Sequence, residues 1–114
     1  MQESQLIVKS KQFALDIIKF CNNAKANRVG FVLVNQLLKS GTSIGANIRE
    51  AFYAHGKADF IAKLQIALKE CSETEYWLEL ITESGMYRDE ELLPACSELK
   101  RMLISSINTA KKNI

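Results

Sequence analysis

The stretch QLLKSGTSIGANIREAF, residues 36–52, carries a regular apolar pattern that decides the fold of this segment. The members of the pattern follow steps of four, three, four and three residues: Leu37, Gly41, Ile44, Ile48 and Ala51. This spacing matches the period of an α-helix, so it places these positions on one face. The stretch therefore predicts an amphipathic helix that buries one face against other helices.

The same spacing recurs through most of the chain and predicts three further helices. The segments expected to be helical are residues 4–24, 28–54, 57–84 and 89–112. In the first two segments the apolar series are Leu6, Ser10, Phe13, Ile17, Phe20 and Ala24, and then Leu33 followed by Leu37, Gly41, Ile44, Ile48 and Ala51. In the last two segments they are Phe60, Leu64, Ala67, Cys71, Thr74, Leu78 and Ile81, and then Leu92, Cys96, Leu99, Leu103 and Ile107. Two members of these series, Ser10 and Thr74, are hydroxyl residues. No sustained alternation of apolar and polar residues indicates a strand.

Short breaks separate these segments and set their directions. Gly30, Gly56 and Gly85 lie at or beside the breaks, and glycine commonly ends helices. Pro94 falls in the first turn of the last segment, where its missing N–H is harmless. Helices joined by short connections run antiparallel. We therefore predict an all-α protein, an up-down-up-down antiparallel four-helix bundle, with residues 1–114 as a single domain.

The composition excludes several classes of protein. Of 114 residues, 47% are hydrophobic and 25% are charged, and there is one proline. These values are typical of a globular protein and unlike a disordered, collagen-like or turn-rich all-β chain. No apolar run approaches the roughly 18 residues of a membrane helix, and the N-terminal residues lack the apolar core of a signal peptide. We expect a cytoplasmic protein with no membrane partner.

Residues that commonly carry catalysis or bind metals are few and scattered. Cys21, Cys71 and Cys96 lie far apart among apolar positions, which favours reduced core cysteines over disulfides or a zinc site. The single histidine, His55, is interpreted as a helix-end residue rather than the partner of a nucleophilic cysteine. Phosphate-binding loops, nucleophile elbows and zinc-protease motifs are absent from the sequence. We expect no catalytic residue, metal, cofactor or small-molecule substrate.

Two glycines lie four residues apart inside the second predicted helix. Gly41 and Gly45 each cost about 1 kcal/mol relative to alanine in a helix. Close packing of the backbone against a neighbouring helix is the favoured use of the missing side chains. A kink, or a smooth face for another subunit, is the alternative.

A row of polar residues borders the apolar face of the same helix. Its members follow steps of four, three, four and three: Gln36, Ser40, Ser43, Asn47 and Glu50. Such groups are hydrated, or paired within the bundle or across subunits, and possible partners are Lys39, Arg49, Glu73 and Glu75. The favoured interpretation is a partly solvated boundary row with local pairs, and a hydrogen-bond network that fixes helix register is the alternative. We expect Asn47 and Glu50 to be structural rather than catalytic, because loss of one buried partner costs about 1–3 kcal/mol. A di-iron site is rejected because it needs Glu-x-x-His pairs.

Charge is distributed unevenly along the chain. Residues 1–57 contain eight Lys or Arg and three Asp or Glu, a net of +5, whereas residues 58–114 contain seven and ten, a net of −3. Cationic surface attracts phosphate backbones. The candidate nucleic-acid-binding residues are therefore Lys9, Lys11, Lys19, Arg28, Lys39 and Arg49. We do not expect all six on one face of a monomer. A solvated surface, or pairing with the acidic helix of a sister subunit, is the alternative.

Additional apolar residues lie beside the predicted apolar faces: Val34, Leu38, Phe52, Trp77 and Leu80. Contiguous exposed apolar patches usually mark interfaces, so we expect a homo-oligomer. Trp77 lies on the acidic third helix, where nucleic acid is repelled. It is interpreted as an anchor at the core edge or in a subunit interface.

Two runs, SGTSIGANIREA and KADFIAKLQIALKECSETEYWLELI, resemble the bacterial four helix bundle protein family, also called the rRNA intervening-sequence protein family and historically described as ribosomal proteins. In the first run the likeness is carried by Ser43, Ile44, Asn47, Ile48 and Glu50. In the second run it is carried by Phe60, Leu64, Ala67, Leu68, Glu73 and Glu75. Lys39 and Ser40 stand where many members carry arginines, which weakens a bidentate contact there.

The resemblance implies a four-helix bundle and a homo-oligomer, since related bundles assemble as pentameric rings. Some members are encoded within intervening sequences of bacterial rRNA genes. Others resemble the accessory protein of diversity-generating retroelements, which binds a reverse transcriptase and nucleic acid, and no member is established as an enzyme. The expected function is a non-enzymatic oligomer that binds RNA, or a complex of nucleic acid with a reverse-transcriptase-type protein, through basic surface. A protein-binding scaffold without nucleic-acid affinity is the alternative.

Overall fold

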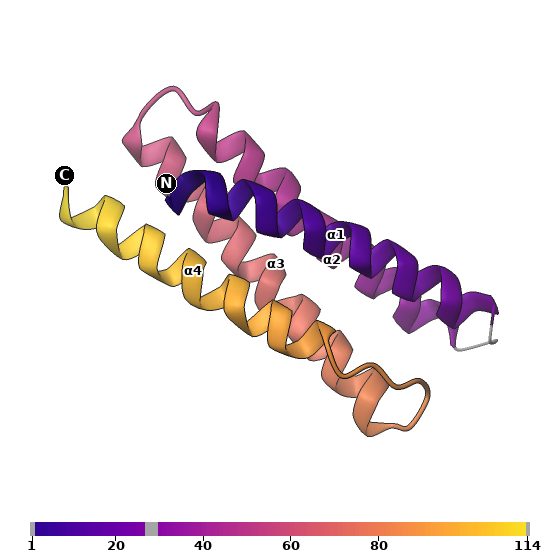
Figure 1. Ribbon diagram of the computed structural model, residues 1–114. Coiled ribbons are helices and arrows are strands. Elements are labelled where there is room, and N and C mark those ends of the chain that lie inside the picture. The colour runs from indigo at the N-terminus through magenta and orange to yellow at the C-terminus, as the bar shows by residue number, and fades with distance from the viewer. Residues whose placement is uncertain (1, 27–29, 114) are drawn as a thin grey trace.

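The chain forms four helices in the computed structural model, which describes residues 2–26 and 30–113 (Figure 1). They are α1 (Gln2–Ala26), α2 (Phe31–Phe52), α3 (Lys57–Glu83) and α4 (Leu92–Lys112). The described residues contain no strand. None of the four helices, within those residues, has the length and hydropathy needed to cross a membrane.

The helices pack in a ring in the order of the sequence. α1 contacts α2, α2 contacts α3, α3 contacts α4, and α4 closes the ring against α1, while the diagonal pairs make no backbone contact. Successive helices run in opposite directions, so α1 begins and α4 ends at the same end of the molecule (Figure 1). The bundle measures 48 × 22 × 21 Å. The predicted up-down-up-down four-helix bundle is confirmed.

The buried residues follow the predicted apolar series closely, and all of the series in α1 and α4 is buried. The prediction is wrong at two positions. Val34 rather than Leu33 is buried at the start of α2, and Ile61 rather than Phe60 at the start of α3. The ring of Phe60 instead packs edge-on against Phe52, with ring centroids 5.4 Å apart, at the end of the bundle. Adjacent apolar residues leave the periodicity unable to choose between them.

The two glycines of α2 lie where α1 comes closest. A Cβ added to Gly41 would lie 3.0 Å from two side-chain carbons of Ile17. A Cβ added to Gly45 would lie 3.4 Å from the carbonyl oxygen and the hydroxyl of Ser10. The favoured interpretation, close packing against a neighbouring helix, is therefore confirmed, and that neighbour is α1.

The helix boundaries differ from the prediction mainly at α2, which spans Phe31–Phe52 rather than residues 28–54, and at α4, which begins at Leu92 rather than at residue 89. The Asp89 carboxylate accepts hydrogen bonds from the backbone N–H groups of Glu91 and Leu92, both at 2.8 Å. Asp89 therefore satisfies the free donors at the start of α4 from outside the helix. Gly85, just beyond the end of α3, has a φ of 76°, which favours glycine.

The apolar residues predicted to lie beside the core do not form an exposed patch. Val34 is fully buried, and Leu38, Phe52 and Trp77 pack half-buried against the core. Leu80 is half-buried as well. The large apolar side chains that are exposed on α1 and at the start of α2 are instead Val8, Leu15, Ile18, Phe31 and Val32.

Candidate nucleic-acid interface

A surface groove of about 370 Å³ runs between α1 and α2, directly over their closest approach. Its floor is made of small residues, among them Gly45, which cannot fill it. Lys11 on α1 and Arg49 on α2 line the same groove, with the hydroxyl residue Thr42. The antiparallel packing of α1 and α2 thus brings together two cations that are 38 residues apart in the sequence.

The two cations of this groove carry free charge. Lys11 and Arg49 are both exposed, and neither forms an ion pair with another described residue. Glu50 also lines the groove, but its carboxylate accepts a hydrogen bond from Lys63 on α3 at 3.2 Å. The groove therefore presents a net positive surface that can accept a phosphate group.

The other predicted cations lie on different faces. Lys9 forms an ion pair with Glu98 on α4, with 3.0 Å between Nζ and Oε1. Lys19 lines a separate groove between α1 and the start of α4. Lys39 lies in a notch between α2 and α3, and Arg28 lies outside the described residues. Of the five candidates that the structure describes, only Lys11 and Arg49 line the same groove.

The polar row of α2 divides into a buried part and an exposed part. Ser40 is buried, Ser43 and Asn47 are half-buried, and Gln36 and Glu50 are exposed. The Asn47 amide donates to the Ser43 carbonyl of its own helix at 2.9 Å. Of the row, Ser40 is therefore the buried member, and Glu50 pairs with Lys63 on α3 at the surface.

The partner of Ser40 on α3 is Thr74. Its Oγ1 lies 2.9 Å from the Ser40 Oγ and 2.8 Å from the Glu70 carbonyl, and both hydroxyl side chains are buried. Of the two possible acidic partners on α3, Glu73 lines the same notch as Ser40 and Ser43. Glu75 faces the opposite way and pairs with Lys100 on α4 at 3.0 Å. Sequence reasoning placed Thr74 in the apolar series and so missed its bonding role.

Two carboxylates of α3 border the notch beside Ser40. Glu70 and Glu73 line this space of about 150 Å³ together with Lys39. Burial, followed by the charge and hydrogen bond of Glu73, raises the pKa of Glu70, while Lys69 and Lys39 oppose the shift. The charged form of Glu70 is therefore disfavoured in the folded protein. No cluster of three or more His, Cys, Asp or Glu suited to a metal ion occurs among the described residues.

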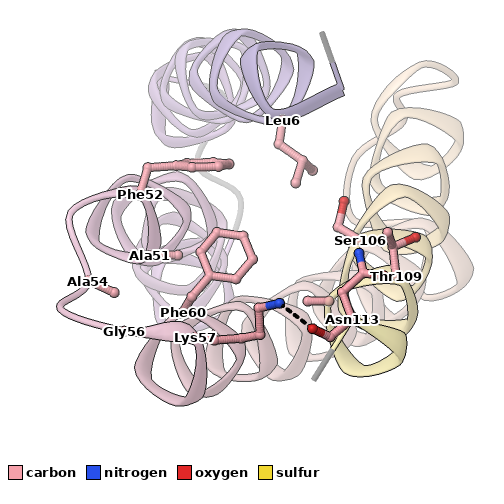
Figure 2. A pocket seen from close by; sticks show the side chains of 11 residues that line it. Leu6, Ala51, Phe52, Ala54, Gly56, Lys57, Phe60, Ser106, Thr109 and Asn113 are labelled. Atoms are coloured by element: carbon pink, nitrogen blue, oxygen red, sulfur yellow. Dashed lines mark hydrogen bonds between the residues drawn. The ribbon is translucent and has the colours of Figure 1, made fainter.

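A second concavity, of about 460 Å³, lies at the end of the bundle where α1 begins and α4 ends (Figure 2). Phe52 and Phe60 form one wall, and Leu6, Ser106 and Thr109 form the other. The Lys57 ammonium donates to the Asn113 carbonyl at 2.8 Å across its rim. Because all four helices contribute residues to this pocket, no pattern within a single segment of the sequence predicts it. It contains one cation, which is already bonded, so it offers less free charge than the α1–α2 groove.

Comparison with known proteins identifies the family of this chain. The family model for the 23S rRNA-intervening sequence protein matches residues 2–105. The chain belongs to that family. The 23S rRNA-intervening sequence protein fold is also seen in the crystal structure of a protein of unknown function from the S23 ribosomal protein family of Bacteroides thetaiotaomicron. That structure is 43% identical, with a TM-score of 0.91 over 95% of this chain and 99% of the other. A search of curated proteins found no match.

Proposed function

We propose that this protein is a non-enzymatic, oligomeric member of the 23S rRNA-intervening sequence protein family that binds RNA through the basic surface of α1 and α2. Support comes from membership of a family named for an element of rRNA genes, and from the net charge of +5 on residues 1–57. RNA phosphates attract such a surface regardless of base sequence.

The observation that carries the proposal is the groove shared by Lys11 and Arg49. Neither cation has an acidic partner among the described residues, so each keeps its charge available for a ligand. Arginine also binds phosphate through two parallel N–H donors, which makes the contact directional as well as electrostatic. The small floor of the groove lets a phosphate backbone approach both cations.

An oligomer would multiply this groove. Val8, Leu15 and Ile18 lie exposed on α1, and Val8 and Leu15 are two helical turns apart on one side of it. Exposed apolar side chains of this size gain from burial against another protein surface. We assign that surface to a second copy of the chain, because α3 of a sister subunit offers the exposed acidic residues Glu73 and Glu79 around exposed Tyr76, which complement the basic α1.

The test compares two double variants with the same change of charge. K11E/R49E reverses the groove cations, and K69E/R101E reverses an exposed lysine and an exposed arginine on α3 and α4. Binding of labelled single-stranded RNA is measured by fluorescence anisotropy over a range of salt concentrations. We expect K11E/R49E to weaken binding at least about tenfold and to lower the salt slope by about 1.4, since each phosphate contact contributes about 0.7. The control variant K69E/R101E should change both the affinity for RNA and the salt slope much less.

Light scattering on the same samples separates this proposal from the protein-binding alternative. If the wild type binds no RNA even at low salt and K11E/R49E dissociates the oligomer, the basic groove serves subunit contacts and RNA binding is refuted. If both double variants weaken RNA binding equally, the groove has no special role. RNA binding lost with the oligomer intact supports the proposal.

A further inference from the structure

Two cysteines that are 25 residues apart in the sequence meet inside the bundle. Cys71 on α3 and Cys96 on α4 have their Sγ atoms 3.7 Å apart. Each Sγ also lies 3.4 Å from the carbonyl oxygen of the other residue, so the two side chains cross the gap between the helices in both directions. Only about 1.7 Å separates this arrangement from the sulfur–sulfur distance of a disulfide, roughly 2.05 Å.

The third cysteine provides an internal contrast. Cys21 is also buried, but its Sγ faces the carbonyl oxygen of Val34 at 3.6 Å rather than another sulfur. Burial raises the pKa of Cys21 to about 11, with Lys25 opposing, so its thiol stays protonated near neutral pH. Any reaction that needs two neighbouring sulfurs is therefore confined to Cys71 and Cys96.

We propose that Cys71 and Cys96 form a reversible intramolecular disulfide between α3 and α4 when the folded protein meets a peroxide. The Cys71 thiolate attacks one peroxide oxygen, the O–O bond breaks, and hydroxide leaves, which gives a sulfenic acid on Cys71. The Cys96 sulfur then attacks the Cys71 sulfur, the S–O bond breaks, and the departing hydroxide takes the Cys96 proton as water. Two thiols are oxidised, and one peroxide is reduced to two waters.

The environment of the pair sets the order of these steps. A hydrogen bond from Cys96 is the largest influence and lowers the pKa of Cys71, although burial opposes it. The same contact, together with burial, raises the pKa of Cys96. The ion pair of Glu75 and Lys100 faces both thiols, and its two charges act in opposite directions. Cys71 is thus the first thiolate and Cys96 the resolving thiol.

Burial sets the kind of oxidant. Cys71 is 0% and Cys96 is 1% exposed, so the sulfurs are reached only when the packing opens transiently. Hydrogen peroxide is close to water in size and enters through such openings, whereas a bulky disulfide such as oxidised glutathione needs a much larger one. We therefore expect slow oxidation by hydrogen peroxide and slower oxidation by oxidised glutathione.

The test treats the reduced, folded full chain with hydrogen peroxide, removes the peroxide with catalase, and then alkylates the remaining thiols in denaturant. All three cysteines are free before treatment. Intact mass spectrometry should show the loss of two hydrogen atoms, and alkylation should fall from three thiols to one. Peptide mapping should locate the link at Cys71 and Cys96 and the alkylated thiol at Cys21. Dithiothreitol should restore all three thiols.

Three comparisons make the result specific. C21S should form the same link, because its changed residue takes no part. The same oxidation in urea should give mixed pairings among the three cysteines, whereas the folded protein should give one. The linked protein should also unfold at a higher temperature than the reduced protein, because the bridge restricts the unfolded chain.

Several results would overturn the proposal, and the first needs no variant. A folded wild type that keeps three alkylatable thiols after peroxide exposure, or that gains oxygen atoms without losing two hydrogens, would contradict it. A link through Cys21 or between two chains would contradict the placement. A linked protein that unfolds at a lower temperature would show that the bundle does not accommodate the bridge.

Discussion

Gly41 and Gly45 occupy the same contact between α1 and α2 but differ in the room beside them. Gly41 faces the branched carbons of Ile17, which is fully buried and has no space to retreat. Gly45 faces Ser10 at ordinary van der Waals distance. One glycine is therefore required by packing, and the other is a helix-weakening residue with space for a methyl group.

We expect G41A and G45A to have opposite effects on stability. Alanine at either site gains about 1 kcal/mol of helix propensity. At position 41 overpacking costs about 1–3 kcal/mol and outweighs that gain, whereas at position 45 most of the gain remains. Urea unfolding of the two variants measures the difference. Equal destabilisation by both would show that Gly45 is equally confined.

Glu70 has a pH-dependent effect on stability because its folded-state pKa is raised above the ordinary value of 4.5. The folded protein binds a proton there more readily than the unfolded chain does. Stability from this residue is therefore present at low pH and is lost as the pH rises through the raised pKa.

Replacement of Glu70 by glutamine should therefore leave the protein as stable as the wild type or slightly more stable at pH 7. The expected gain is about 0.2–0.5 kcal/mol, since it removes a like-charge pair with Glu73 one turn away. The gain should disappear as the pH falls below 4.5, where both forms are neutral. Thermal melts at both pH values measure it, with E79Q, on the exposed side of α3, as the control. A loss of stability at pH 7 would contradict this account.

At the scale of the elements, one buried hydrogen bond ties α2 to α3. The Ser40 and Thr74 hydroxyls meet in the interior, while Asn47 bonds to its own helix and the exposed Glu50 pairs with Lys63 on α3. This bond favours one relative register of α2 and α3, while each hydroxyl also has a carbonyl partner on its own helix: Leu37 for Ser40 at 3.4 Å and Glu70 for Thr74 at 2.8 Å.

We expect T74V to destabilise the protein by about 1 kcal/mol, because valine keeps the shape but removes the hydrogen bond to Ser40, which then keeps only its 3.4 Å contact with the Leu37 carbonyl. T42V is the matched control, since the Thr42 hydroxyl bonds to the Leu38 carbonyl of its own helix at 2.8 Å and should matter less. The double variant S40A/T74V should cost less than the sum of the two single changes. Strictly additive costs in urea unfolding would show that the two hydroxyls do not interact.

At the scale of the whole molecule, the exposed apolar side chains of α1 predict self-association. L15E places a charge in the middle of that face, and I104E does the same at a comparably exposed position on α4. We expect the wild type and I104E to scatter light as oligomers, and L15E to shift toward the 12.8 kDa monomer with unchanged helix content. A wild type that is monomeric at micromolar concentration would refute the assembly.

The cysteine pair and the end pocket also belong to this scale. Cys71 with Cys96, and Lys57 with Asn113, are contacts between residues that lie far apart in the sequence. Neither could be assigned from spacing along one helix, because spacing reports which residues share a face and not which face of another helix lies opposite.

The sequence by itself determined the number of helices, their approximate limits and nearly every buried position. It could do so because the steps of three and four place residues on one face whatever the neighbouring helices are. It also indicated the close helix contact at Gly41 and Gly45, because glycine weakens a helix and close packing is a use for its missing side chain. The resemblance of two runs of the sequence also indicated the family.

Only the tertiary structure decided which cations line one groove, which hydroxyl forms a hydrogen bond with Ser40 and which two cysteines lie in contact. Lys11 and Arg49 come together because α1 and α2 pack antiparallel at one particular register, and Ser40 reaches Thr74 because α3 packs beside it at another. Register depends on how whole side-chain surfaces interlock. The residue pattern of a single helix does not specify that register, so these sites form only when the four helices pack together.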